Sequence, residues 1–212
     1  MPFFTNGMDI LEKLFGSAAK VKLIKLFLLN PETVFDAAEA GERAKVSRAV
    51  TRKEILNLEK INFLRQKSYI KEVRRQKNRR MQIFRKRTNG WTLDYKFPYI
   101  EAVKTFLSSI SPFNYKEMVK KISRSGKIQL LIVAGIFIKN NDSRVDLLVV
   151  GDNLKQNQLD NTVKTIESEV GKEIRYAIFE TSEFNYRYSI FDKLARDILD
   201  YPHKKIINKL NL

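Results

Sequence analysis

Three aspartates lie around the most apolar stretch of the chain, and their side chains are the ones best suited to metal-dependent chemistry. Asp142 and Asp146 precede residues 147–150, which are all apolar, and Asp152 follows them. Paired carboxylates can hold two divalent metal ions that take part in catalysis. Asp142 and Asp152 are too far apart for one compact site, because an extended chain rises about 3.3 Å per residue. Asp146 alone does not hold a metal pair, and we expect it to be held by one of three partners: Arg144, Lys139 or a backbone amide.

Other reactive side chains are scarce. The chain has no cysteine, which excludes disulfides, thiolate metal sites and cysteine nucleophiles. Its single histidine, His203, follows Tyr201-Pro202 near the end of the chain, where we expect a surface or packing role. Neither a glycine-rich phosphate loop with a following lysine nor a serine–histidine pattern is present. We therefore expect no catalytic residue, no metal and no cofactor. The start of the chain carries no export signal, so the expected location is cytoplasmic.

The second kind of chemistry that the residues offer is the binding of phosphate by cations. The 212 residues include 40 Lys and Arg against 24 Asp and Glu, a formal net charge of +16. Residues 1–97 contribute 22 basic and 10 acidic side chains, so three quarters of the excess lies in the first half. Such an excess points to a polyanion, either nucleic acid or an anionic membrane. The basic stretch alternates like strands and is not a basic amphipathic helix, so we expect no membrane partner.

A helix-turn-helix is predicted in the first half of the chain. Apolar residues spaced by three and four indicate a helix over 9–29, which Gly16 splits or bends, and Asp36 caps a second helix that reaches Ala44. Ser47 caps a third helix, in which four residues form the predicted buried stripe: Thr51, Ile55, Leu58 and Ile61. The residues off this stripe are the predicted contacts to base edges in a major groove: Ser47, Arg48, Arg52, Lys53 and Asn57.

A basic hairpin follows the third helix. Residues 68–74 and 81–85 alternate in the manner of strands, and ten basic residues lie between Lys67 and Arg87 against one acid, Glu72. A basic strand pair next to a recognition helix is typical of the wing of a winged helix, which lies along phosphates or enters the adjacent minor groove. The predicted phosphate ligands are Arg74, Arg75, Lys77, Arg79, Arg80, Arg85, Lys86 and Arg87.

The first hundred residues resemble the ArsR-type branch of the winged-helix regulators. Ile61-Asn62-Phe63-Leu64 is similar to the Ile-Gly-Phe-Leu ending common in that family, and the pattern runs from Leu14 to Pro98. The resemblance implies a DNA-binding regulator. Metal sensing does not carry over, because the sensing members use Cys and His ligands and this chain has no cysteine.

Two helices are predicted in a connector over residues 98–126, at 100–110 and 114–122. Two interpretations stay open for them. In one they pack on the winged helix and pair two chains into a homodimer, as suits symmetric half-sites, and in the other they begin the next domain. We favour dimer contacts from the first of the two.

The second half predicts a small α/β sheet. Apolar runs indicate strands over 129–134, 145–150 and 174–179. Asn153 caps a helix that Gly171 ends, and Thr181 or Ser182 caps another before a last helix over 191–199. Strands alternating with helices in this order favour a sheet with helices packed on it.

Residues 127–207 resemble the minimal nucleotidyltransferase domain of the DNA polymerase β-like fold. Active members place a Gly-Ser after the first strand, an Asp-x-Asp on the second and a third carboxylate on the next. This chain has Gly135-Ile136 at the first motif and Arg144 where the first aspartate belongs, and residues 174–179 contain no acid. The resemblance therefore implies a catalytically inactive version of the fold.

These observations combine into an α+β protein with three parts. Residues 1–97 form a winged helix-turn-helix DNA-binding domain, 98–126 a helical connector, and 127–212 a nucleotidyltransferase-like domain. The expected function is sequence-specific binding of double-stranded DNA by a transcriptional regulator, with the last domain as a module for a small molecule or a protein partner. The alternatives are an active nucleotidyltransferase that modifies a protein or nucleic acid, and an RNA-binding adaptor.

Overall fold

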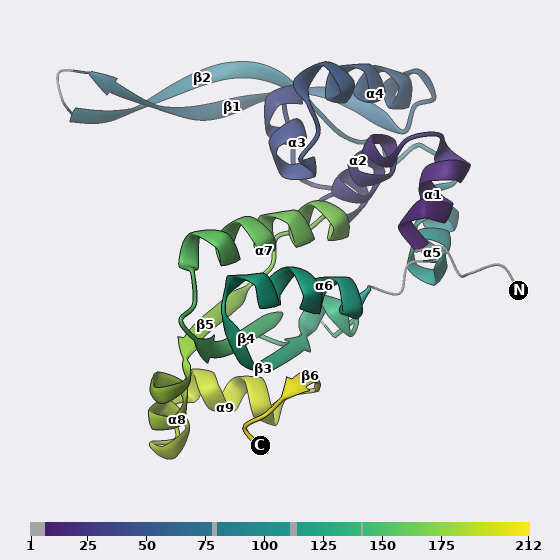
Figure 1. Ribbon diagram of the computed structural model, residues 1–212. Helices are drawn as coiled ribbons and strands as arrows, with labels where there is room; N and C mark the ends of the chain where they lie inside the picture. The colour runs from purple at the N-terminus through teal and green to yellow at the C-terminus, as the bar shows by residue number, and fades with distance from the viewer. Residues whose placement is uncertain (1–6, 78–79, 111–113, 141) are drawn as a thin grey trace, which may run out of the picture. The chain divides into compact units, whose positions relative to one another are not determined.

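The fold is α+β, as the sequence predicts, and it consists of two compact units (Figure 1). The computed structural model describes residues 7–77, 80–110, 114–140 and 142–212, and the side chains of these residues except 7–9, 74–77, 80–82 and 110. Unit 1 is made of residues 1–112 with 168–172, and unit 2 of residues 113–167 with 173–212.

The first helices of unit 1 are separated at a glycine. α1 (Gly7–Phe15) ends before Gly16, whose φ of +78° is a left-handed conformation that glycine adopts without strain. Ser17 then caps α2 (Ala18–Leu29) by accepting a hydrogen bond from the Lys20 amide at 3.2 Å. The predicted split of the 9–29 helix is therefore confirmed. α2 is buried over most of its circumference and forms the centre of the unit.

The helix-turn-helix pairs α3 (Ala37–Ala44) with α4 (Arg48–Lys60). The turn between them is tight: Lys45 has a φ of +50°, and the Val46 amide donates to the Gly41 carbonyl at 2.9 Å. Glycine at position 41 allows this close packing, because a Cβ there would lie 2.9 Å from Thr51 Oγ1 and 3.0 Å from the Val46 carbonyl oxygen, so that the turn would have to shift. Ser47 occupies the N-cap position of α4 as predicted, but its side chain makes no capping hydrogen bond.

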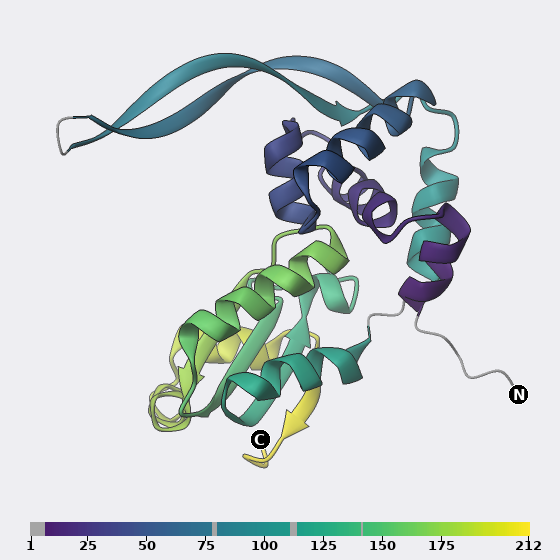
Figure 2. The same ribbon diagram turned by 45° about the horizontal axis from the view of Figure 1, so that its top comes forward.

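The basic hairpin is longer than the sequence predicts. β1 (Leu64–Lys77) and β2 (Arg80–Leu93) pair antiparallel from Leu64 opposite Leu93 to Lys77 opposite Arg80. Both views show the twisted ribbon extending beyond α3 and α4 of the same unit (Figures 1 and 2). Strands of 14 residues are about 45 Å long at roughly 3.3 Å per residue.

The core of unit 1 also holds α5 (Ile100–Ile110), whose Leu107 is buried in the cluster formed by α2, α4 and the base of the hairpin. The predicted stripe of α4 is confirmed at Thr51, Ile55 and Leu58, which are at most 2% exposed. The prediction is wrong for Ile61, which is 57% exposed because α4 ends at Lys60 and the chain turns away there.

Unit 2 is built on a mixed four-stranded sheet with the strand order β5-β4-β3-β6. β4 pairs antiparallel with β3 and parallel with β5, the parallel connection passing through α7, and β6 pairs antiparallel with β3 on its other side. The strands are β3 (Lys127–Ala134), β4 (Leu147–Asp152), β5 (Tyr176–Glu180) and β6 (His203–Asn208).

The last strand, β6, is absent from the sequence prediction. It lies at an edge of the sheet and contains Lys204 and Lys205, so it lacks the apolar pattern of a buried strand. Lysines at a sheet edge discourage pairing with another chain. His203 thus lies in an edge strand, where its Nδ1 is 2.9 Å from the Tyr201 carbonyl oxygen.

The helices of unit 2 follow the prediction apart from three starting points, one of which is that of the last helix: it begins at Lys193 and not at Phe191, whose φ is +58°. Asn153 has a φ of +54° and does not cap the following helix, which begins three residues later at Gln156. Glu180, and neither Thr181 nor Ser182, is the N-cap residue of α8. The helical elements are α6 (Tyr115–Ile122), η1 (Ser123–Ser125), η2 (Gly135–Phe137), α7 (Gln156–Val170), α8 (Thr181–Ser189) and α9 (Lys193–Asp200).

The helices predicted as a connector divide between the units: α5 belongs to unit 1 and α6 to unit 2. In the part of the chain that the structure describes, no helix combines the length and the apolar character needed to cross a membrane.

Candidate nucleic-acid interface

The outward face of α4 is cationic. Ser47, Arg48, Arg52 and Lys53 are exposed and Asn57 is half-buried, so the structure places these predicted residues together on the solvent side of the helix. Within the described residues, Arg48, Arg52 and Lys53 take part in no ion pair. Three guanidinium or ammonium groups are therefore available to an external anion.

The acids of α4 are turned toward the body of the unit. Glu54 is 7% exposed and lies 3.7 Å from Lys20 Nζ, while Glu59 accepts a hydrogen bond from Trp91 Nε1 at 3.0 Å. The sequence pattern places apolar residues and Thr51 on the inner face of α4, and the structure adds Glu54 to that face. Its spacing of three from Thr51 and four from Leu58 is the signal that places it on that face. Because both acids point inward, no carboxylate of α4 offsets the charge of the outer face.

The hairpin presents cations on both of its faces. Arg85, Lys86 and Arg87 are exposed; Arg85 Nε lies 3.2 Å from Glu72 Oε1, and Arg87 Nε donates to Ser68 Oγ at 3.0 Å. Alternate residues of a strand point to opposite faces, so neighbours in the chain such as these three divide between the two sides. The side chains of four predicted ligands are not described, although their backbone is in the strands: Arg74, Arg75, Lys77 and Arg80. Arg79 lies outside the described residues.

One lysine of the hairpin is held by acids of α3. Lys71 Nζ lies 2.5 Å from Asp36 Oδ2 and 2.8 Å from Glu39 Oε1, and Tyr69 OH donates to Glu39 Oε2 at 2.7 Å. Partial burial alone would raise the pKa of both carboxyls, but the hydrogen bonds from Lys71 and from backbone amides outweigh it and lower both. Partial burial would likewise lower the pKa of Lys71, but its two acidic partners raise it. All three groups are charged at neutral pH.

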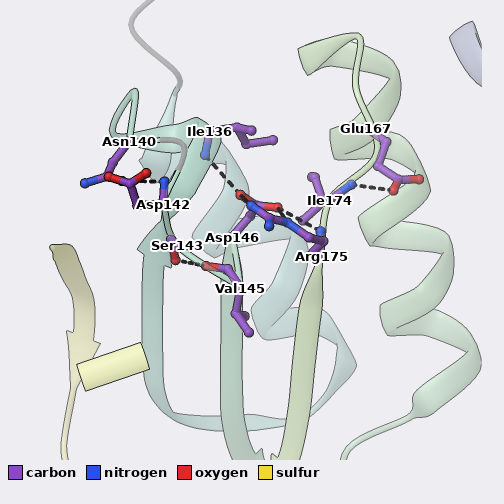
Figure 3. Close-up of polar contacts among 9 residues, drawn as sticks. All are labelled: Ile136, Asn140, Asp142, Ser143, Val145, Asp146, Glu167, Ile174 and Arg175. Carbon is purple, nitrogen blue, oxygen red and sulfur yellow. Dashed lines mark hydrogen bonds and ion pairs between the residues drawn. The ribbon is translucent and has the colours of Figure 1, made fainter. Parts of the chain in front are cut away.

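The carboxylate of Asp146 is fully occupied by hydrogen bonds (Figure 3). It is 1% exposed and accepts from the Ile136 amide at 3.0 Å and the Arg175 amide at 2.9 Å, and from Arg175 Nε and Nη2 at 3.0 and 3.1 Å. The predicted backbone partner is confirmed, but the side-chain partner is Arg175 rather than Arg144 or Lys139. Arg144 Nη1 instead lies 3.0 Å from Asp197 Oδ2.

The sheet register explains why the sequence alone does not predict Arg175 as the partner of Asp146. Leu147 of β4 pairs with Tyr176 of β5, so the residues just before them, Asp146 and Arg175, lie side by side. The signal in the sequence is an acid and a base at the same position of two neighbouring parallel strands, and it is visible only once those strands are known to be neighbours.

The electrostatics of this site disfavour a metal ion. Burial would raise the pKa of Asp146, but the hydrogen bonds from Arg175 and the Ile136 amide outweigh it and lower the pKa below its ordinary value. The carboxylate is thus ionised and neutralised by a guanidinium. Asp152, the other predicted acid near β4, accepts from Gln129 Nε2 at 2.8 Å. Within the described ranges, no group of three or more His, Cys, Asp or Glu side chains is arranged to hold a metal.

Compared with known protein families, curated proteins and solved structures, the chain matches none of them. The assignment of a function therefore depends on the geometry and charge described above.

Proposed function

We propose that the chain binds double-stranded DNA through α4 and the hairpin and acts as a cytoplasmic transcriptional regulator. The observation that supports this most is the sorting of charge on α4: its cations face solvent without acidic partners among the described residues, and its acids face inward. A purely solvating helix has no need of that separation, whereas a helix that approaches phosphates does.

The major groove of B-DNA suits this helix. It is about 12 Å wide and admits an α-helix, whose N-terminal side chains reach base edges. Arg48 and Arg52 lie one turn apart in the N-terminal half of α4 and are exposed. Arginine binds guanine in a bidentate manner, so these two residues are our candidates for sequence readout, with Ser47, Lys53 and Asn57 beside them.

The hairpin supplies contacts that do not read sequence. Beyond the pair formed by Lys71 and Lys86, β1 continues for six residues to Lys77, about 20 Å at roughly 3.3 Å per residue. Successive grooves on one side of the duplex are about half a helical turn apart, roughly 17 Å. The outer hairpin is long enough to reach the flanking minor groove, where cations on both faces meet phosphates of both strands.

We propose that α5 of unit 1 pairs two chains into a homodimer. We propose for unit 2 that it is a sensing or interaction module, and that it has the nucleotidyltransferase-like arrangement without the catalytic activity. The ion pair between Asp146 and Arg175 supports the proposal for unit 2, because a metal pair needs free carboxylates at that position. Transfer of label from a nucleoside triphosphate with Mg²⁺, lost in Asp146→Ala, would contradict it.

The division of labour between helix and hairpin is tested by two variants. Arg52→Ala should reduce the free energy of binding to a duplex selected from a random pool by about 1–3 kcal/mol. It should also reduce the preference for that duplex over a scrambled one. Arg79→Ala with Arg80→Ala should weaken binding to both duplexes equally, and should reduce the slope of log affinity against log salt concentration by about two. Fluorescence anisotropy of both duplexes measures this, and identical behaviour of the two variants would refute the assignment.

A further inference from the structure

The hairpin is attached to the helices of unit 1 at two separate places. The first is its base, where the Trp91 amide donates to the Phe35 carbonyl at 2.8 Å and the Phe35 amide donates back at 3.0 Å, beside the buried Leu64 and Leu93. The second lies further out, where Tyr69 and Lys71 of β1 meet the first turn of α3. A ribbon held at two points has a fixed direction, whereas one held only at its base can bend.

The second attachment uses the capping residues of α3. Oδ1 of Asp36 accepts from the amides of Ala38 and Glu39, which leaves its Oδ2 for Lys71. Oε2 of Glu39 accepts from the Asp36 amide and Tyr69 OH, which leaves its Oε1 for Lys71. The hydrogen bonds at the helix terminus orient both carboxylates independently of the hairpin, so little further ordering is needed to bind the ammonium group.

From this attachment toward the tip, the described residues of the hairpin form no hydrogen bond or ion pair with the helices. Lys86 lies directly opposite Lys71 in the ladder, yet it is exposed and forms no ion pair among the described residues. Further out, Ile83 is 61% exposed, and Arg85 pairs with Glu72 of the hairpin itself. Of the two lysines at this level, one anchors the ribbon and the other is available to an external partner.

The length of the hairpin makes its direction important. From its base at Gln66 to Lys77 the ribbon spans about 37 Å at roughly 3.4 Å per residue, so a swing of about 10° at the base moves the tip by about 6.5 Å. The minor groove of B-DNA is only about 6 Å wide. In the proposed complex, a hairpin without its second attachment would therefore leave the minor groove while α4 stays in the major groove.

We propose that Asp36, Glu39, Tyr69 and Lys71 form a latch that sets the direction of the hairpin, so that its tip and α4 engage one duplex together. These four are positioning residues, and the proposal rests on the proposed function of duplex binding. The latch gives Lys71 a role opposite to that of its basic neighbours, because it binds carboxylates of its own chain in place of phosphate.

The variant that tests the latch is Asp36→Ser with Glu39→Gln. Serine is a good N-cap and glutamine completes a capping box, so α3 keeps its N-terminal hydrogen bonds. The change raises the net charge by two, and simple attraction then predicts tighter duplex binding. The latch predicts binding weaker by about three- to tenfold, the effect of losing one charged network and the contacts that it positions. Glu12→Gln with Glu101→Gln is the matched control, since it removes two exposed acids elsewhere in unit 1 and should not weaken binding.

Spin labels separate the latch from the proposed function. The chain has no cysteine, so Ile83→Cys in the hairpin and Lys60→Cys at the end of α4 give a unique labelled pair. Without DNA, the electron–electron distance distribution should be narrow in the parent and clearly broader after Asp36→Ser with Glu39→Gln. An unchanged distribution, or tighter duplex binding by that variant, would overturn the latch. Broadening in a protein that binds no duplex would leave the latch standing and refute the proposed function alone.

Discussion

Raising the salt concentration from 50 to 200 mM should weaken duplex binding by about 10³- to 10⁵-fold, because cations that neutralise phosphates release bound counterions. A loss of this size corresponds to about six to ten phosphate contacts. The exposed cations of α4 and the basic stretch of the hairpin supply that many, even if Arg85 and Arg87 keep their partners Glu72 and Ser68. Affinity measured by anisotropy at several salt concentrations gives the slope directly.

The form of the salt dependence distinguishes this interface from other polyanion binding. The logarithm of affinity should fall linearly with the logarithm of salt, at about −0.9 per phosphate contact on B-DNA. Double-stranded RNA of the same length should bind more weakly, because its deep and narrow major groove does not admit α4. A nearly flat salt dependence, or a preference for RNA, would contradict the assignment of α4 to the major groove.

Replacing Asp146 by alanine should destabilise unit 2 by about 2–4 kcal/mol. Removing one partner of a fully buried ion pair typically costs about 3–5 kcal/mol. We expect somewhat less here, because the Arg175 side chain is 53% exposed and water takes over part of its solvation. The loss also leaves the Ile136 and Arg175 amides without their acceptor. Urea unfolding followed by far-ultraviolet circular dichroism measures the change.

The single tryptophan provides an internal control for that experiment. Trp91 belongs to unit 1, so its fluorescence should report the unfolding of unit 1, whose midpoint Asp146→Ala should leave unchanged.

The stability of unit 2 should also depend on pH through Asp146. Because the pKa of Asp146 is lowered in the folded state, its contribution to the free energy of unfolding is present above the unfolded value of about 3.9 and is lost as pH falls through the folded value. Unit 2 of the parent should therefore lose stability below about pH 4. Asp146→Ala should lose less stability over the same pH range, because it has no carboxylate at this position to protonate. Equal stability of parent and variant at pH 7 would show that the ion pair does not hold the sheet together.

Local patterns in the sequence predict much of the fold. The three- and four-residue spacing finds α4 and its buried face, and Asp36 as a cap predicts the start of α3. The hairpin is predicted too short mainly at its base, because residues 64–67 and 86–93 are mostly polar and do not alternate regularly. The edge strand β6 is missed for the same reason, since a lysine-rich strand has no apolar side to recognise.

The side-chain partners depend on contacts between distant segments, which no local pattern contains. Arg175 and Asp146 are 29 residues apart in the sequence, and only the parallel register of β4 and β5 brings them together. The sequence gives no sign that Lys71 differs from the other cations of the hairpin, because its ion pairs with Asp36 and Glu39 form only in the folded unit. Charge composition predicts the kind of partner, whereas the fold decides which charges are available to it.

The most direct test of the central claim compares two variants that lose the same charge. Arg48, Arg52 and Lys53 of α4 are changed to glutamine in one, and the exposed Lys116, Lys120 and Lys164 of unit 2 in the other. We expect the α4 variant to bind a duplex at least about 100-fold more weakly at 100 mM salt, and the unit 2 variant to change affinity by less than about threefold. Equal losses in two variants that both remain folded by circular dichroism would show that the net charge, and not the outward face of α4, holds the DNA.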